Sequence, residues 1–166
     1  MKIFCAVLTL LALSLPAHAQ QAVEELGDFN YWSAYSFQKD GNKICYMVTS
    51  PIKQTGNVKG RKDTFMVVTN TPSEGTYDIV NLQAGYNYKK GSKIAVNIGK
   101  DAFTMSPFED MAWLKDGDDK LVAAMIKGNT AVVQATAENG VKTVDTYSLV
   151  GFTKARKAMT KACPQK

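Results

Sequence analysis

Residues 31–49 read YWSAYSFQKDGNKICYMVT, two β-type runs on either side of a turn signal. Aromatic and β-branched side chains are enriched in strands, and Asp-Gly between two such runs is among the strongest short-range signals of a hairpin. The pair Asp40-Gly41 therefore predicts a tight turn that joins strands over 31–37 and 44–49. These two strands are the starting point for the rest of the fold.

Similar runs continue along the chain at short spacing. In one of them, Ile94, Val96 and Ile98 alternate with more polar residues, as in a half-buried strand. Asn139-Gly140 marks another hairpin turn. The further strand predictions cover residues 64–69, 77–88, 93–98, 130–137 and 141–150, with a loop over 50–61. About seven to nine short strands favour an antiparallel sandwich over a sheet of alternating strands and helices.

Two segments break the strand pattern and predict helices. The first begins at Asp118 or Asp119, either of which can cap it, and runs to Lys127 before Gly128. The second follows Thr153, a predicted N-cap, and places alanine, methionine and cysteine side chains on one stripe with lysine and arginine on the other face. The predicted class is all-β with a short internal helix and a C-terminal helix.

The N-terminus predicts export. Residues 1–19 contain one early lysine, a long apolar run and Ala17-His18-Ala19, the pattern of a cleaved signal peptide. We expect a flexible leader over 20–29 and a single domain over 30–166. Cleavage removes His18, the only histidine in the chain, and one of its three cysteines.

Two cysteines, Cys45 and Cys163, remain in the mature chain. In an oxidising compartment two cysteines most simply pair with each other, which would join the C-terminal helix to an early strand. The alternative is a reactive thiol, but the chain has no Cys-x-x-Cys motif and its mature part has no histidine to activate a thiolate.

Composition and motifs argue against several functional classes. Lys and Arg number 20 against 15 Asp and Glu, a mild excess that does not resemble a nucleic-acid footprint. No second apolar run is long enough to cross a bilayer. Asp116, Asp118 and Asp119 do not have the spacing of a calcium loop, and the scattered methionines suggest core packing instead of copper binding. No serine-hydrolase motif occurs. We therefore expect no metal, no cofactor and no catalytic residues.

The segment Tyr86-Asn87-Tyr88-Lys89-Lys90, with Lys93 nearby, is the predicted interaction patch. If the strand alternates regularly, Tyr86 and Tyr88 share one face beside three positive charges, which suits a glycan, an anionic lipid or an acidic protein surface. In the alternative, both rings cover the sheet core and their hydroxyls lie at its edge. The frequency of aromatic residues in sandwich interiors favours this alternative.

The chain from about Tyr31 to Cys163 resembles the invasion-associated locus B family of exported bacterial proteins. The most specific match is Asp145-Thr-Tyr-Ser-Leu-Val-Gly-Phe152. Other matching residues are Trp32, 44–46, 85–88, 91–92, 112–113, 121–125, Gly128 and Cys163. The resemblance implies an immunoglobulin-like β-sandwich in the periplasm, on the outer membrane or outside the cell. It also implies a link to host-cell entry in some pathogenic alphaproteobacteria, and it supplies no catalytic residues.

The function expected from these observations is that of a non-enzymatic exported protein that binds an envelope or host-cell macromolecule. It would assist association with host cells or their invasion. The alternative is a periplasmic structural or envelope-stress factor that has no host contact. The sequence makes no prediction of the oligomeric state.

Overall fold

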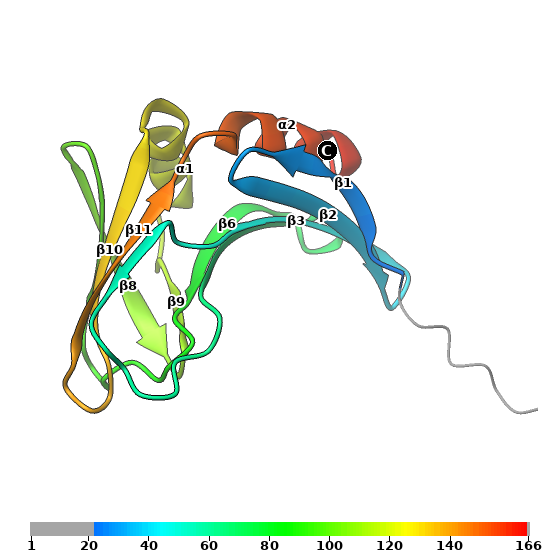
Figure 1. Cartoon of the computed structure of the whole chain (residues 1–166). Coiled ribbons are helices and arrows are strands. Elements are labelled where there is room, and N and C mark those ends of the chain that lie inside the picture. Colours follow the sequence, from blue (N-terminus) through cyan, green and yellow to red (C-terminus); the bar gives the residue numbers. More distant parts are fainter. Residues whose placement is uncertain (1–21, 166) are drawn as a thin grey trace, which may run out of the picture.

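The computed structural model describes residues 22–165, which form eleven strands, two α-helices and one short 3₁₀ turn (Figure 1). The strands are β1 (Glu24–Phe29), β2 (Trp32–Lys39), β3 (Asn42–Thr49), β4 (Lys53–Thr55), β5 (Phe65–Thr71), β6 (Thr76–Gln83), β7 (Ile94–Ile98), β8 (Asp101–Phe108), β9 (Met111–Trp113), β10 (Thr130–Thr136) and β11 (Lys142–Ser148). The helices are α1 (Asp118–Lys127) and α2 (Phe152–Ala162), and the 3₁₀ turn covers Pro72–Glu74. The predicted signal peptide lies outside the described residues.

All strands belong to one antiparallel sheet in the order β1-β2-β3-β5-β6-β9-β8-β7-β10-β11-β4. Strand β8 connects its two halves. Residues 101–105 pair with β7, and residues 106–108 pair with β9. Strands that pass from one sheet half to the other form the corners of sandwiches. In Figure 1 one half forms an arch and the other an upright lobe.

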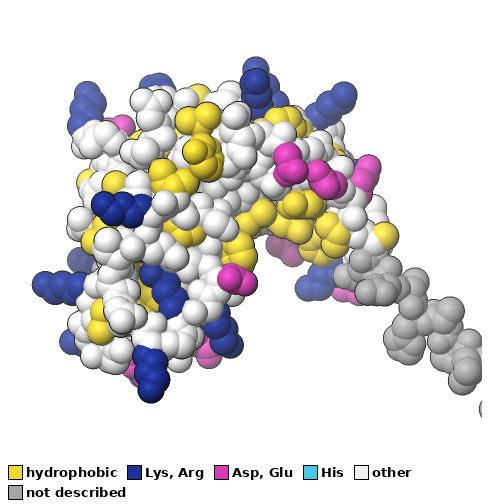
Figure 2. Space-filling model, viewed as in Figure 1, with side chains coloured by type: hydrophobic (Ala, Val, Ile, Leu, Met, Phe, Trp, Pro, Cys, Tyr) yellow, Lys and Arg dark blue, Asp and Glu magenta, His cyan; other side chains and the backbone are white. Residues whose placement is uncertain are grey.

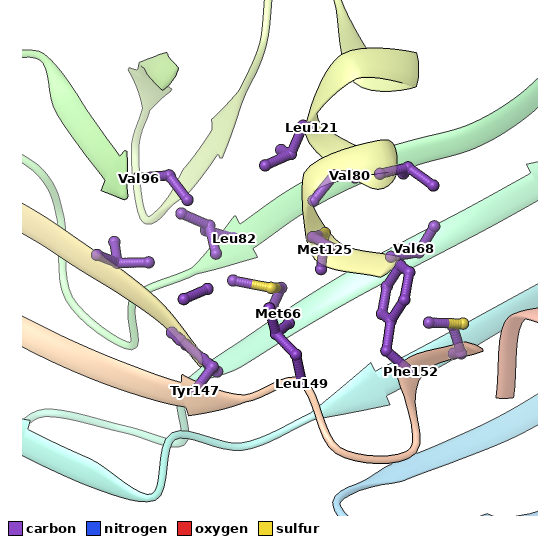
Figure 3. Close-up of a cluster of buried hydrophobic side chains, with 14 of the residues drawn as sticks. Met66, Val68, Val80, Leu82, Val96, Leu121, Met125, Tyr147, Leu149 and Phe152 are labelled. Atoms are coloured by element: carbon purple, nitrogen blue, oxygen red, sulfur yellow. The ribbon is translucent and has the colours of Figure 1, made fainter. Parts of the chain in front are cut away.

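A single hydrophobic core joins the two halves (Figure 3). Val68 and Leu82 come from the arch, Val96 and Tyr147 from the lobe, and Met125 from α1. Five of the methionines are at most 1% exposed, which confirms their predicted role in core packing; they are Met47, Met66, Met105, Met125 and Met159. The structure confirms the all-β antiparallel sandwich class with an internal and a C-terminal helix.

Helix α2 packs on β1, β2 and β3. At its start, the Phe152 ring meets the Trp32 ring edge to face, with 5.1 Å between the centroids. The Trp32 indole nitrogen donates a hydrogen bond to the Ser148 carbonyl oxygen at 3.0 Å. Farther along, the Arg156 guanidinium donates to the Asp78 carboxylate through Nε at 2.9 Å and Nη2 at 2.5 Å. The ring contact and the Arg156 bonds connect the last helix to β2 and β6, and the Trp32 bond connects β2 to β11.

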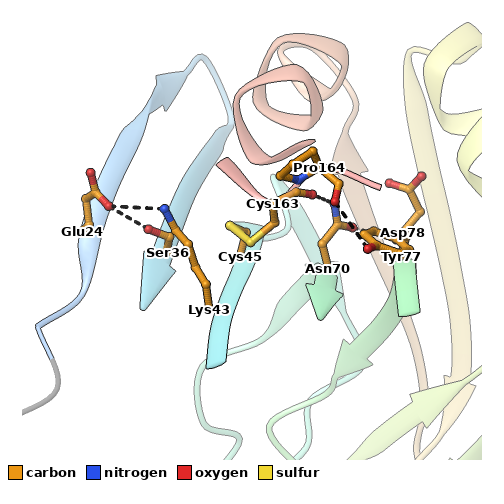
Figure 4. The surroundings of a disulfide bond; sticks show 9 residues. All are labelled: Glu24, Ser36, Lys43, Cys45, Asn70, Tyr77, Asp78, Cys163 and Pro164. Atoms are coloured by element: carbon orange, nitrogen blue, oxygen red, sulfur yellow. Dashed lines mark hydrogen bonds and ion pairs between the residues drawn. A yellow bond between two sulfur atoms is a disulfide. The ribbon is translucent and has the colours of Figure 1, made fainter. Parts of the chain in front are cut away.

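The predicted disulfide between Cys45 and Cys163 is confirmed (Figure 4). It joins β3 to the end of α2 across 118 residues, and both cysteines are at most 1% exposed. The Asn70 amide nitrogen donates to the Cys163 carbonyl oxygen at 3.4 Å. The covalent bond and the polar contacts therefore hold the same end of the chain.

The prediction of a flexible leader over 20–29 is wrong for Glu24–Phe29, which form the edge strand β1. Its polar sequence lacks the alternation of apolar residues that predicts a strand. An edge strand pairs on one side only, so its side chains can remain exposed to solvent. The Ser36 hydroxyl donates to the Glu24 carboxylate at 2.9 Å, and the Ser33 hydroxyl donates to Asp28. The ordered domain therefore begins upstream of residue 30.

The predicted helix caps are also wrong. Both helices begin after a glycine with positive φ, Gly117 (87°) and Gly151 (98°), and neither cap makes a side-chain hydrogen bond. A Cβ atom on Gly151 would lie 1.7 Å from the Phe29 carbonyl oxygen, so backbone packing selects glycine there. Asp118 is the first residue of α1, and Thr153 is the second residue of α2.

Candidate functional site

Four loops meet at one end of the upright lobe, and we call this surface the loop end; it lies at the lower left of Figure 1. The loops cover residues 56–63, 84–92, 109–110 and 137–140. The segment 84–88 is bonded to the other three through its backbone. The bonds run from Lys62 N to Gly85 O (2.9 Å), Ala84 N to Asp110 O (2.8 Å), Tyr88 N to Glu109 O (2.8 Å) and Glu138 N to Asn87 O (2.8 Å). Because these bonds lie within the protein, the backbone of the loop end has a defined conformation without a ligand.

Gly85 is required by this arrangement. Its φ of 73° lies in the left-handed region, and a Cβ atom there would stand 2.3 Å from the Lys62 carbonyl oxygen. Only glycine permits so close an approach of two backbones without displacement. Gly85 is one of the residues that carry the family resemblance, and this close contact with Lys62 explains why the position requires glycine.

A buried ion pair supports the loop end from beneath. Arg61 Nη2 lies 2.5 Å from Asp145 Oδ2, and the two side chains are only 12% and 5% exposed. Arg61 Nε also donates to the Ala84 carbonyl oxygen at 3.1 Å. The guanidinium lies over the Tyr86 ring, 5.0 Å from its centroid. One arginine therefore holds a strand of the lobe, the segment 84–88 and an aromatic ring together.

The pKa values of the three tyrosines around this ion pair, Tyr86, Tyr88 and Tyr147, are raised. Burial, and then the negative charge of Asp145, raise the pKa of Tyr147, which is 1% exposed. Burial, and then neighbouring Tyr86, raise the pKa of Tyr88, which is 6% exposed. Burial also raises the pKa of Tyr86, whose hydroxyl lies 2.6 Å from the Thr143 hydroxyl. The phenols under the loop end are therefore held in their neutral form.

These shifts predict that stability declines at alkaline pH. Above about pH 10 the unfolded chain releases tyrosine protons that the folded chain retains, so the folded state binds more protons and the free energy of unfolding falls with rising pH. Urea unfolding measured between about pH 8 and pH 11 checks this. Tyr147→Phe keeps the ring, removes one titrating hydroxyl and should make the decline shallower. Equal declines in both proteins would contradict the role of Tyr147.

Two neighbouring hollows open on the loop end. The polar hollow, of about 470 Å³, is lined by Val58, Lys59, Gly60, Lys62, Gly85, Tyr86, Asn87, Asp110, Ala137, Glu138 and Asn139. The aromatic hollow, of about 330 Å³, is lined by Asn87, Tyr88, Lys90, Gly91, Pro107, Phe108, Glu109 and Glu138. They share Asn87 and Glu138. Both volumes fall within the roughly 300–1,000 Å³ typical of ligand sites.

The structure separates the members of the predicted patch. Tyr86 lines the polar hollow, and Tyr88 and Lys90 line the aromatic hollow. The rings of Tyr86 and Tyr88 touch edge to face at 5.5 Å, but Tyr88 is buried in the core, as the alternative interpretation has it. Lys89 is exposed, and Lys93 faces a different depression beside Lys142 on the outer face of the lobe.

Two residues at the loop end were not predicted from the sequence. Phe108 is the most exposed large hydrophobic side chain among residues 22–165, at 66%. Arg61 was placed in a loop without a role. Asp145 offered a signal for it, because it alternates with Thr143 and Tyr147 toward the core, where a carboxylate needs a partner.

A second surface is the concave face of the arch, where Figure 2 shows hydrophobic side chains beneath β2 and β3. The rings of Tyr35 and Tyr46 stack at 5.3 Å, and Phe37 meets Tyr46 at 6.0 Å. Figure 2 also shows Lys and Arg side chains spread around the lobe and acidic side chains over the end that carries β1.

No cluster of three or more metal-binding side chains occurs within residues 22–165. None of the helices in this part of the chain has the length and hydrophobicity needed to cross a bilayer. The Asp118 carboxylate accepts a hydrogen bond from the Val80 backbone at 2.8 Å, which ties α1 to β6.

Comparison with known proteins gives one family and one fold. Residues 32–160 match the family described as Invasion associated locus B (IalB) protein. The structure is similar to the crystal structure of invasion associated protein B from Bartonella henselae, with a TM-score of 0.59 and 17% sequence identity over 81% of this chain and 94% of that chain. A search of curated protein sequences finds no match.

Proposed function

Because the chain belongs to the invasion associated locus B family, we propose that it is a non-enzymatic exported protein that binds a macromolecular partner through its loop end. The partner is an envelope or host-cell molecule, and its binding assists association with host cells. A periplasmic structural or envelope-stress role, without host contact, is the second candidate.

The observation that carries the proposal is the exposed Phe108 ring beside the aromatic hollow. Three charged residues, Lys90, Glu109 and Glu138, line the same hollow. Protein interfaces commonly place an aromatic residue at the centre and polar residues at the rim. Glu109 has a φ of 54°, a rare conformation for a residue with a side chain, and strained residues cluster at functional sites.

Export is supported by the buried disulfide. Disulfides persist in the periplasm and outside the cell and are rare in the cytosol. The bond between Cys45 and Cys163 fits such a compartment, as does the predicted signal peptide.

Photocrosslinking in living cells tests the loop end. A crosslinking amino acid at Phe108 should give discrete adducts, whereas the same group at Ile126, which is exposed on α1, should not. A third protein with the group at Tyr35 tests the concave face. Adducts confined to Tyr35, equal at all three positions, or absent from all would contradict the proposal.

Protease treatment of intact cells separates the two candidate roles. Digestion of the protein, together with outer-membrane or host molecules among the Phe108 adducts, would support host association. Protection from protease, together with periplasmic adducts alone, would support the envelope role.

A further inference from the structure

The polar hollow presents groups of both charges to the same space. Lys59 and Lys62 line it from one loop, and Asp110 and Glu138 line it from two others. A simple anion would meet two carboxylates there, and a simple cation would meet two ammonium groups. The lining therefore favours a neutral ligand that both donates and accepts hydrogen bonds.

Several of these side chains are free to bind. Asn87, Glu138 and Lys59 are exposed, and within residues 22–165 no protein group forms a hydrogen bond or ion pair with their side chains. Their backbone atoms are engaged differently: the Glu138 N–H donates to the Asn87 carbonyl oxygen at 2.8 Å. The frame of the hollow is thus held by the backbone, while its polar side chains remain available.

Tyr86 gives the hollow a rigid aromatic wall. Arg61 lies over its ring, Thr143 bonds its hydroxyl, and Tyr88 meets its edge. A ring held by three contacts can pack against a ligand at little further cost in conformational entropy. An aromatic ring complements the C–H face of a sugar ring.

We propose that the polar hollow is a saccharide-binding site, an inference that rests on the proposed function by making a glycan part of the partner. Sugar hydroxyls donate to the carboxylates of Asp110 and Glu138 and accept from the Lys59 and Lys62 ammonium groups. The sugar ring lies against Tyr86. The volume of the polar hollow, about 470 Å³, lies within the range of small-ligand sites.

The test uses the full mature chain on an array of neutral, acidic and amino oligosaccharides. Signals on the array are followed by titration of the isotope-labelled protein with the same oligosaccharide. Shifts should concentrate on residues of the polar hollow, with the affinity in the millimolar to micromolar range expected for a small ligand in an open site.

Matched variants locate the site. Asn87→Ala and Glu138→Gln should each weaken binding about tenfold or more. The first removes an amide that hydrogen-bonds the ligand, and the second keeps an acceptor oxygen but removes the charge that strengthens its bond with a sugar hydroxyl. Asn129→Ala and Glu74→Gln are the controls, since both residues lie outside the lining of the polar hollow. Thermal unfolding of all four should match that of the parent protein.

Two results would overturn the inference: no array signal, or a signal that the hollow variants and their controls change equally. If Phe108 crosslinks to an unglycosylated partner and the array is silent, the saccharide inference fails and the proposed function stands. If the array signal depends on Asn87 and Glu138 but Phe108 gives no adduct, the saccharide site stands and the proposed loop-end partner fails.

Discussion

Replacing Cys163 with alanine is expected to lower the free energy of unfolding by about 2–5 kcal/mol, the range for native disulfides in secreted domains. The bond closes a loop across 118 residues, so its loss frees a large part of the unfolded chain. In the chain-entropy model a loop of this length corresponds to roughly 4–5 kcal/mol. Urea unfolding measured by circular dichroism gives the difference.

The double variant Cys45→Ala, Cys163→Ala is the control, because it removes the unpaired thiol that the single variant leaves. Both variants should keep α2 docked under native conditions, since Arg156, Trp32 and Phe152 still hold the helix. Stability equal to that of the parent protein in both variants would mean that these contacts suffice without the disulfide.

Replacing Arg61 with alanine is expected to destabilise the protein by about 3–5 kcal/mol, the usual cost of removing one partner from a buried ion pair. Asp145 would keep its charge in the core without the guanidinium. Its Oδ1 atom already has no hydrogen-bond partner within residues 22–165, so no second group replaces Arg61. Denaturant unfolding measures the loss.

A double-mutant cycle with Asp145→Asn separates the ion pair from the other contacts of Arg61. If the buried charge is the main cost, Arg61→Ala should cost less in the protein that already carries Asp145→Asn, with a coupling energy above about 1 kcal/mol. Additive effects would instead assign the loss to the bond with Ala84 and the contact with Tyr86.

Much of the fold could be predicted because local signals and tertiary structure agree. Asp40-Gly41 joins β2 to β3, Asn139-Gly140 joins β10 to β11, and the stripe on α2 carries Cys163 to its partner. These features depend on turn residues and on side-chain periodicity, which are both visible in a single sequence.

The elements that were missed lack such signals. Strands β8 and β9 carry Pro107 and a weak alternation, and their pairing depends on a corner between two sheet halves. Strand β1 is polar because it lies at an edge. The helix caps were missed because a glycine with positive φ, and not a side-chain hydrogen bond, precedes both helices.

The candidate site could be predicted only in part. Tyr86, Tyr88 and Lys90 do reach the loop end, but the residues that shape it come from distant positions. Arg61 and Asp145 are 84 residues apart, and no local pattern connects them. No sequence pattern distinguishes Phe108, and only its exposure in the structure makes it a candidate contact residue.

The separation of Cys45 and Cys163 along the chain affects how their disulfide could form during export. If the chain is exported from its N-terminus, Cys45 reaches the oxidising side 118 residues before Cys163. If residues 1–19 are also removed, Cys163 is the remaining cysteine that can pair with Cys45, so Cys45 stays a thiol until Cys163 has crossed as well. In that interval only a second molecule, a small thiol or an oxidoreductase can capture it. The long separation of the two cysteines therefore makes intermolecular oxidation of Cys45 the reaction that competes with the native disulfide.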